Sequence, residues 1–264
     1  MPAIPRRRDW ADWPAPDLRI DPMRTIAILP TAAVEQHGPH LPLGVDLMIA
    51  EGMLATLRRN CPEDMDIRIL PVQAVGKSNE HLWAAGTLTL SAETALRAWV
   101  EIGLSVARAG VRKIVLINSH GGNLDLISIV SRELRVQAGM LAVKAQWVGF
   151  GAPEGMYSPH EDRFGIHGGD METSLMLHFR PELVDLEKAE DFRSTAETGT
   201  IPPTGPTSLG WIASDLNPAG VVGNAAAATA AKGRATAEHQ TAGMIALLRA
   251  LADLPLDGRE PLPG

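Results

Sequence analysis

Hydrophobic positions along the chain alternate between short continuous apolar runs and longer segments with helical spacing. The short runs, rich in β-branched residues or bounded by Pro and Gly, predict strands at residues 25–30, 67–75, 113–118 and 141–150. Segments with apolar residues every three or four positions predict helices at residues 47–60, 92–109, 124–138 and 170–179, and an Ala-rich segment predicts a last helix at 224–252. Strands that alternate with helices of this length predict βαβ units, in which a largely parallel sheet carries helices on both faces.

Small polar residues and glycines mark the expected ends of two of these helices. Ser91 is the predicted N-cap of one helix, which should end at Gly110. Asn123 is predicted to cap the next helix, which should end near Gly139.

Two irregular segments frame the predicted elements. Residues 1–23 are rich in Pro and Trp and predict an N-terminal arm that lies over the body or over a neighbouring subunit. Residues 191–224 are rich in Pro, Gly, Thr and Ser and predict a long loop of the kind used by lids and intersubunit arms. Because no linker or long-period repeat interrupts the pattern, we expect residues 1–264 to form a single domain.

Composition and charge exclude several classes of partner. With 45% hydrophobic and 21% charged residues, the chain is typical of soluble globular proteins. Its net charge of -7, with no basic block beyond residues 6–8, argues against nucleic acid. The single Cys61 excludes an intrachain disulfide and favours a reducing cytoplasm. No apolar run approaches the roughly 18 residues of a membrane helix, and the N-terminal segment lacks the apolar core of a signal peptide.

The segment after the first predicted strand carries side chains that bind metals. Within LPTAAVEQHGPHLPLGVD, residues 29–46, stand Glu35, His37, His40 and Asp46. Alternate side chains of an extended chain share a face, so Glu35 and His37 can aim at one point, and the Pro and Gly turns can return Asp46 to it. Neutral imidazoles and ionised carboxylates suit a divalent transition metal such as zinc or manganese.

A second pattern occurs twice, as His120-Gly-Gly-Asn123 and His167-Gly-Gly-Asp170. Each copy can deliver a His at a tight turn and leave the N–H groups of a helix N-terminus free to bind an anion. The alternative interpretation is a pair of glycine turns with incidental histidines.

The predicted topology brings these motifs together, because sites in parallel sheets form outside the carboxyl ends of the strands. The first strand end supplies Glu35, His37 and Asp46, and the third supplies His120. The turn before the fifth helix adds His167, Asp170 and Glu172. Such a set is enough for two metals if one Asp bridges them. A binuclear centre activates water near neutral pH and polarises a carbonyl, which indicates hydrolysis of an amide-like bond.

Other catalytic motifs fit less well. Ser119 precedes His120 but lacks the G-x-S-x-G context of a nucleophile elbow. The glycine pairs form neither G-x-G-x-x-G nor a Walker A loop, so nucleotide binding is weakly supported.

Three motifs in this order, EQHGPHLPLGVD, NSHGGN and HGGDMETSLM, resemble the creatininase (creatinine amidohydrolase) family, and GTLTL at 86–90 agrees with it. The resemblance runs from about residue 25 to 186 and fades in the C-terminal third. It implies a three-layer αβα sandwich with a mostly parallel central sheet, two divalent metal ions (zinc first, manganese as the second choice) and a homohexamer. Members hydrolyse cyclic amides or related non-peptide C–N bonds of small molecules.

By the same resemblance, Glu35, Asp46 and His120 hold one metal, while His37 and Asp46 hold the other, with Asp46 bridging. Creatininase has a carboxylate ligand two residues after the His of its third-strand turn, where this chain has Gly122.

We therefore expect Glu172 of the ETS motif to complete the second metal site and to take part in catalysis. His167 matches the family's proton-transfer histidine and is predicted to act as general acid and base.

The substrate is less determined than the metal site. Ile166 is apolar where creatininase has an acid. Creatininase packs its substrate with tryptophans from the loop between the fourth strand and the HGG turn, and here that loop has no Trp after Trp147. Trp83 or Trp147 could form an aromatic wall, although core or subunit packing is the commoner role. We therefore expect a cyclic amide or related small molecule that need not be creatinine.

Three alternatives stay open. The first is a branch of the family that acts on a formamide, a lactone or a small peptide, and the second is a non-catalytic, metal-binding assembly protein. The third is a doubly wound sugar or nucleotide binder, whose ligand binding a chelator would leave unchanged. A set of five inward-facing ligands argues against the assembly protein, which has no physical need for them.

Overall fold

Four parallel strands form the central sheet, in the order β2-β1-β3-β4. They are β1 (Ile26–Thr31), β2 (Ile67–Ile69), β3 (Lys113–Asn118) and β4 (Leu141–Gln146). The computed structural model describes residues 8–258 and 260–261, so residues 1–7 of the predicted N-terminal arm lie outside the described residues. The described part of the arm, from residue 8 to residue 23, holds two short 3-10 turns and an isolated bridge from Asp9 to Ile69.

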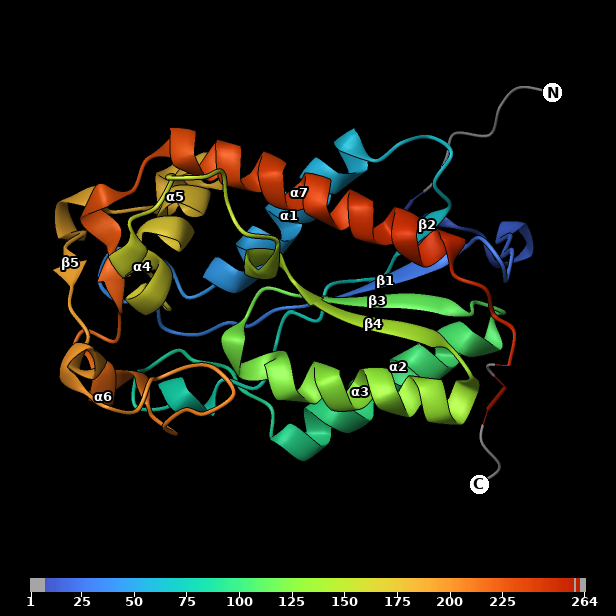
Figure 1. Cartoon of the computed structure of the whole chain (residues 1–264), viewed down its shortest axis with the longest axis horizontal. Coiled ribbons are helices and arrows are strands. Elements are labelled where there is room, and N and C mark those ends of the chain that lie inside the picture. The colour runs from blue at the N-terminus through green and yellow to red at the C-terminus, as the bar shows by residue number, and fades with distance from the viewer. Residues whose placement is uncertain (1–7, 259, 262–264) are drawn as a thin grey trace.

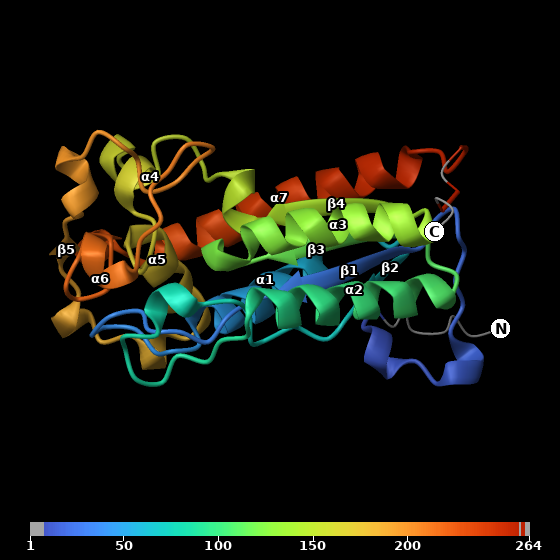
Figure 2. The same cartoon turned by 90° about the horizontal axis from the view of Figure 1, so that it is seen from below.

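Helices cover both faces of the sheet (Figures 1 and 2). One face carries α2 (Ala92–Arg108) and α3 (Leu124–Ala138), and the other carries α1 (Val45–Asn60), α5 (Asp170–Phe179) and α7 (Ala230–Asp253). The predicted three-layer αβα sandwich with a parallel sheet is therefore confirmed. Among the described residues, no helix has both the length and the apolar composition required to span a bilayer.

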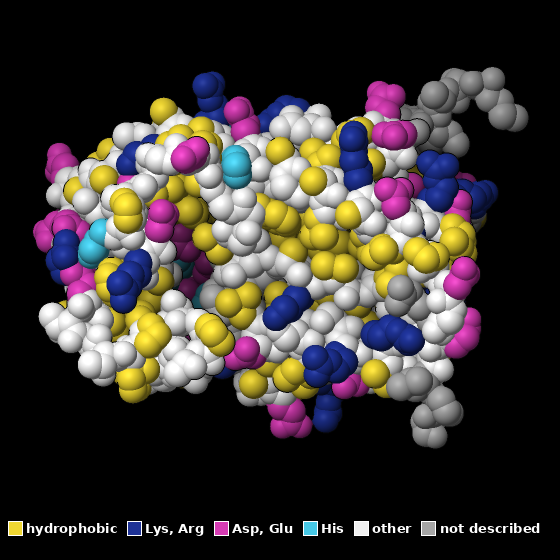
Figure 3. All heavy atoms as spheres, viewed as in Figure 1, with side chains coloured by type: hydrophobic (Ala, Val, Ile, Leu, Met, Phe, Trp, Pro, Cys, Tyr) yellow, Lys and Arg dark blue, Asp and Glu magenta, His cyan; other side chains and the backbone are white. Residues whose placement is uncertain are grey.

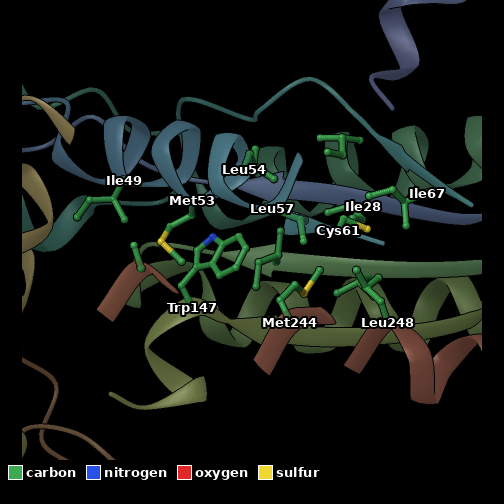
Figure 4. Close-up of a cluster of buried hydrophobic side chains, with 14 of the residues drawn as sticks. Ile28, Ile49, Met53, Leu54, Leu57, Cys61, Ile67, Trp147, Met244 and Leu248 are labelled. Atoms are coloured by element: carbon green, nitrogen blue, oxygen red, sulfur yellow. The ribbon is translucent and has the colours of Figure 1, made fainter. Parts of the chain in front are cut away.

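Successive side chains of a strand point to opposite faces of the sheet, and this divides the core into two layers. Ile26 and Ile28 of β1 point into the layer shared with α1, α5 and α7, while Ala27 and Leu29 point into the layer shared with α2 and α3. Because both faces are covered, the residues of β1 and β3 are buried throughout, as expected for a parallel sheet. Figure 4 shows Trp147 in the first layer, packed among the aliphatic side chains of α1 and α7.

Several predicted boundaries are confirmed. Ser91 caps α2 by accepting the N–H of Thr94, and α3 ends at Gly139, which adopts a left-handed conformation with φ 62°. The boundary at Asn123 is also confirmed, because Asn123 is the N-cap residue and α3 begins at Leu124, but its side chain makes no cap hydrogen bond to the helix.

Three predicted elements differ in extent. β2 ends at Ile69 rather than at residue 75, because Pro71 has no N–H for the ladder and only an isolated bridge from Thr31 to Gln73 continues the pairing. β4 ends at Gln146, and Trp147–Phe150 forms a 3-10 turn. The last helix begins at Ala230 rather than at 224, and Thr229 caps it by accepting the N–H of Lys232.

The segment predicted as a long loop, residues 191–224, contains short regular elements. They are the antiparallel strands β5 (Asp191–Phe192) and β6 (Gly223–Asn224) and the short helix α6 (Ala213–Leu216). Together with α4 (Pro159–Phe164), which the sequence pattern did not predict, they gather beyond the carboxyl ends of the strands (Figure 1).

Candidate metal centre

The carboxyl ends of β1 and β3 bring the first set of polar side chains together. Thr31 and Asn118, the last residues of these strands, are register partners, so the chain leaves both strands at the same edge. The loop after β1 carries Glu35, whose N–H donates to the carbonyl of Leu43 at 2.8 Å and closes the turn. Ser119 donates its hydroxyl to the carbonyl of Asp46 at 2.9 Å, which ties the first turn of α1 to the end of β3.

Glu35, Asp46 and His120 form the first ligand group. The Nδ1 atom of His120 lies 3.2 Å from Glu35 Oε1 and 3.7 Å from Asp46 Oδ2. All three residues are buried. This is the set that the sequence predicted for one metal.

His37, Asp46 and Glu172 form the second group. His37 Nε2 lies 3.9 Å from Asp46 Oδ2 and 3.8 Å from Glu172 Oε2. Asp46 belongs to both groups, so the residues that the sequence predicted for two metals lie around one shared carboxylate.

Backbone carbonyls fix the tautomers of both histidines. His37 Nδ1 lies 3.1 Å from the carbonyl of Glu35, and His120 Nε2 lies 3.0 Å from the carbonyl of Lys77. A carbonyl only accepts hydrogen bonds, so these nitrogens carry the protons. The opposite nitrogen of each ring therefore faces the carboxylates, and once it gives up any proton it carries it can bind a cation, which is the arrangement that metal-ligating histidines adopt.

The buried atoms at the centre of the cluster fit a divalent cation. Within the described part of the chain, Glu35 Oε1 and Oε2, His37 Nε2 and Asp46 Oδ2 have no hydrogen-bond partner. Carboxylates and imidazole nitrogens in this state are costly unless a cation faces them. Divalent transition metals, which accept nitrogen and oxygen donors, would satisfy these four atoms.

The charges in the cluster shift each other's pKa. Burial raises the pKa of Asp46, and the neighbouring Glu35 adds to the effect. Burial alone would lower the pKa of His120, but the carboxylates of Glu35, Asp46 and Glu80 outweigh it and raise that pKa to about 10. The cluster therefore attracts positive charge strongly.

His167 lies beside the cluster with one nitrogen directed into it. Its Nε2 donates to the carbonyl of Gln36 at 2.8 Å, and its Nδ1 lies 3.7 Å from Glu35 Oε1. The ring stands between His37 and His81, with centroid distances of 4.2 and 4.4 Å. Nδ1 is thus the nitrogen that is free to exchange a proton at the site.

Glu172 reaches the site from the first turn of α5. Its Oε2 accepts the N–H of Gly168 at 2.6 Å, which holds the side chain over the His167 turn. The side chain is 26% exposed, and it is the only member of the two groups that is not fully buried among the described residues. Burial nevertheless raises its pKa.

Two residues expected near the metals lie elsewhere. His40 Nε2 donates to the carbonyl of Gly168 at 3.1 Å, so this histidine supports the turn rather than the cluster. Asp170 forms an ion pair with Lys232 of α7 at 2.5 Å. Neither residue belongs to a ligand group among the described residues, because each polar tip is engaged by another partner.

The structure also explains the glycine at position 122. A Cβ atom at Gly122 would lie too close to Glu80 Oε1 and to the carbonyl of Lys77. The carboxylate that creatininase carries at this point therefore has no room here. Asn123, the predicted cap, instead accepts the N–H of Lys77 and donates to the carbonyl of Ala32.

Two site residues were not assigned from the sequence. His81 Nε2 lies 3.3 Å from Glu35 Oε1, and its Nδ1 accepts from the amide of Gln36 at 2.8 Å. Glu80 Oε1 lies 3.5 Å from His120 Nε2, on the side of that ring opposite the nitrogen that faces Glu35 and Asp46. In the sequence, Glu80 and His81 stand next to each other in a long polar connection, and this pair could have indicated a site. Their spacing from Glu35, however, did not show that they lie close to the loop after the first strand.

A hollow is visible on the face shown in Figure 3, with acidic and histidine side chains at its base. Among the described members of the two ligand groups, Glu172 is the one whose side chain is partly exposed to solvent.

Comparison with protein families gives one match over most of the chain. The model described as creatininase, creatinine amidohydrolase, matches residues 11–248.

Individual relatives include enzymes with two different substrates. A mycofactocin precursor peptide peptidase of Mycolicibacterium smegmatis is 30% identical over 213 residues, which is 80% of this chain and 79% of the relative. The same enzyme of Mycobacterium tuberculosis is 32% identical over 78% of each chain. A creatinine amidohydrolase of Pseudomonas putida is 29% identical, covering 68% of this chain and 74% of the relative.

Solved structures share the fold. A putative creatinine amidohydrolase from Bacteroides fragilis superposes with a TM-score of 0.72 at 21% identity, covering 94% of this chain and 97% of the other. A creatininase described as the Mn form superposes with a TM-score of 0.67 at 24% identity, covering 87% and 92% of the two chains.

Proposed function

This chain belongs to the creatininase family of hydrolases, and on that premise we propose that it is a metal-dependent amidohydrolase whose two divalent ions share Asp46. Glu35, Asp46 and His120 would hold one ion, and His37, Asp46 and Glu172 the other. The single observation that supports this proposal is the pair of overlapping ligand groups around one buried carboxylate.

Zinc is the first candidate for these ions and manganese the second. Imidazole nitrogens combined with carboxylates suit either metal. Structural relatives described as a Mn creatininase and as a Zn-Zn creatininase support the same two candidates.

The ions would supply Lewis acidity toward a carbonyl and toward a water molecule. The protein's own residues then have separate tasks. His167 would take up and return a proton at Nδ1, because its Nε2 is committed to the carbonyl of Gln36. Glu172 would act both as a ligand and as the carboxylate that faces the open side of the site, since its side chain remains partly exposed.

The bond we propose to be hydrolysed is an amide C–N bond. The sequence-based restriction to non-peptide bonds is not supported, because relatives of about 30% identity are peptide peptidases. We therefore place a short peptide first and a cyclic amide such as creatinine second, the latter supported by the Pseudomonas putida relative.

The test of this function combines metal content with a substrate panel. Protein purified without chelator or nickel resin is analysed by elemental mass spectrometry, and turnover is measured on short peptides, creatinine, other cyclic amides, formamides and lactones. We expect close to two ions per chain and amide hydrolysis that EDTA abolishes and added zinc or manganese restores. A protein that neither contains nor takes up metal would refute the proposal and favour the binding-module alternative.

The single domain over residues 1–264, the homohexamer and the cytoplasmic location stay predictions. Native mass spectrometry on the purified chain tests the assembly.

A further inference from the structure

A buried carboxylate outside the metal groups occupies the junction behind the His167 turn. Glu161, on α4, is 5% exposed and points between the first turn of α5 and β6. Its Oε1 accepts the N–H of Asp170 at 2.7 Å, and its Oε2 accepts the N–H of Asn224 at 2.8 Å. Both oxygens are thus engaged by backbone donors from two other elements.

Three glycines make room for this carboxylate. A Cβ atom added at Gly165, Gly169 or Gly223 would clash with Glu161 Oε1, at 2.1, 2.3 and 2.7 Å respectively. Gly169 and Gly223 come from different elements, so the space around Glu161 is built from distant parts of the sequence. Such close approach of backbone to a carboxylate is possible only without side chains at these positions.

Glu161 also provides the N-terminal cap that α5 lacks. The N-cap residue of α5 is Gly169, which has no side chain to offer, and the first N–H groups of a helix need an acceptor. Glu172 satisfies the N–H of Gly168, and Glu161 satisfies the N–H of Asp170. A negative charge at this end also interacts favourably with the helix dipole.

The two hydrogen bonds of Glu161 attach to the chain close to His167 and close to Val222, the backbone partner of His167. His167 pairs with Val222 through two backbone hydrogen bonds, His167 N–H to Val222 at 3.2 Å and Val222 N–H to His167 at 2.7 Å. Glu161 bonds to Asp170, three residues after His167, and to Asn224, two residues after Val222. It therefore ties both strands of this bridge to α4.

We propose that Glu161 is a positioning residue that clamps the first turn of α5 to β6, and thereby fixes the directions of His167 and Glu172. This inference rests on the proposed function for its effect on metal binding, but the clamp itself does not depend on that function.

The first test compares Glu161→Gln with Asp162→Asn, an exposed carboxylate one residue away on the same helix. Gln keeps the shape of Glu but places an NH₂ group against one of two N–H donors, so one hydrogen bond must be lost. We expect faster backbone hydrogen exchange at Asp170 or Asn224 in Glu161→Gln and unchanged exchange in the control. Wild-type exchange at both positions in Glu161→Gln would overturn the clamp.

The second test measures zinc binding by competition with a chromogenic chelator. We expect Glu161→Gln to weaken the site that contains Glu172 by about 10–100-fold, as loss of outer-sphere support does, while the site of Glu35 and His120 keeps its affinity. Equal weakening of both sites, or of neither, would refute the positioning role. If wild-type protein binds no zinc, the proposed function fails, and hydrogen exchange alone decides on the clamp.

A double-mutant cycle keeps the inference testable if Glu161→Gln folds poorly. Gly169→Ala should lower the Tm of the wild type, since its methyl group meets the Glu161 carboxylate. In a Glu161→Ala background Gly169→Ala should lower the Tm much less, because the Glu161 carboxylate is gone and only the Cα atom of Gly223, at 3.0 Å, still lies close to the new methyl group. An equal loss of Tm in both backgrounds would show that Glu161 and Gly169 do not interact.

Discussion

His37 and Asp46 face each other with Nε2 3.9 Å from Oδ2, which is too long for a hydrogen bond and short enough for one ion to contact both atoms. Zinc binds nitrogen at about 2.0–2.1 Å and carboxylate oxygen at about 2.0–2.2 Å, so an ion between them spans this distance. Neither atom has a hydrogen-bond partner in the part of the chain that the structure describes. The pair is therefore arranged for a ligand rather than for direct contact.

Replacing Asp46 should remove both metals. In Asp46→Asn the shared anionic ligand is lost, so we expect elemental mass spectrometry to find less than about one tenth of the wild-type metal content. The fold should persist, because burial and Glu35 already disfavour the charge on Asp46, and circular dichroism should match that of metal-free wild type. An Asp46→Asn protein with two tightly bound ions would exclude the shared-ligand arrangement.

Replacing Glu172 should remove one metal only. Glu172→Gln weakens the group that contains His37 and leaves Glu35, Asp46 and His120 untouched. We expect close to one ion per chain under conditions in which the wild type holds two. If two ions remain, the ligand that is missing at Gly122 comes from another residue, and His167, which groups with Glu35 and His37, is the next to test.

His167 should matter for turnover more than for metal binding. His167→Ala removes the nitrogen that faces Glu35 at 3.7 Å, and loss of a general acid and base costs about 100- to 10,000-fold in rate. Metal content should stay near two ions per chain. A large loss of metal in His167→Ala would instead identify this residue as a ligand, which the grouping of Glu35, His37 and His167 also allows geometrically.

Metal should stabilise the folded chain by mass action. At free zinc of about 100 times the Kd, the stabilisation is about 2.7 kcal/mol, which for a chain of this size corresponds to a rise in Tm of roughly 5–10 °C. Differential scanning fluorimetry of EDTA-treated protein, with and without zinc, measures this shift. Asp46→Asn is the control and should show little or no rise.

His40 should make the folded state sensitive to acid. Burial lowers its pKa from 6.5 to about 4, whereas the carbonyl of Gly168 opposes the shift. Because the folded pKa lies below the unfolded one, the stabilisation from neutral His40 is complete above pH 6.5 and is lost as the pH falls toward 4. Urea unfolding of His40→Gln between pH 7 and 4 should therefore show a flatter decline in the free energy of unfolding than the wild type. Parallel pH profiles for the two proteins would contradict this assignment.

The sequence by itself determined the elements and most of the ligand chemistry. Short apolar runs and helical periodicity report directly on burial, so the four strands and the main helices follow from local pattern. Glu35, His37 and Asp46 lie within twelve residues, and the parallel topology places His120 at the same edge of the sheet. These inferences need only spacing and strand direction.

Local pattern was less informative where regular structure depends on distant partners. The extent of β2 was overestimated, because the apolar residues beyond Pro71 read as strand while the ladder needs an N–H that proline lacks. The short strands β5 and β6 were missed, because two-residue strands exist only through their pairing with each other.

Only the tertiary structure decided which polar side chains share the site. His81 and Glu80 lie at the site, whereas His40 and Asp170 contact other parts of the protein. The direction of a side chain depends on the elements that pack around it, and its position along the chain does not determine that direction. The same holds for Glu161, whose two hydrogen-bond donors lie 9 and 63 residues away in the sequence. Residue types and spacing supplied the chemistry, and long-range packing determined how that chemistry is arranged around Asp46.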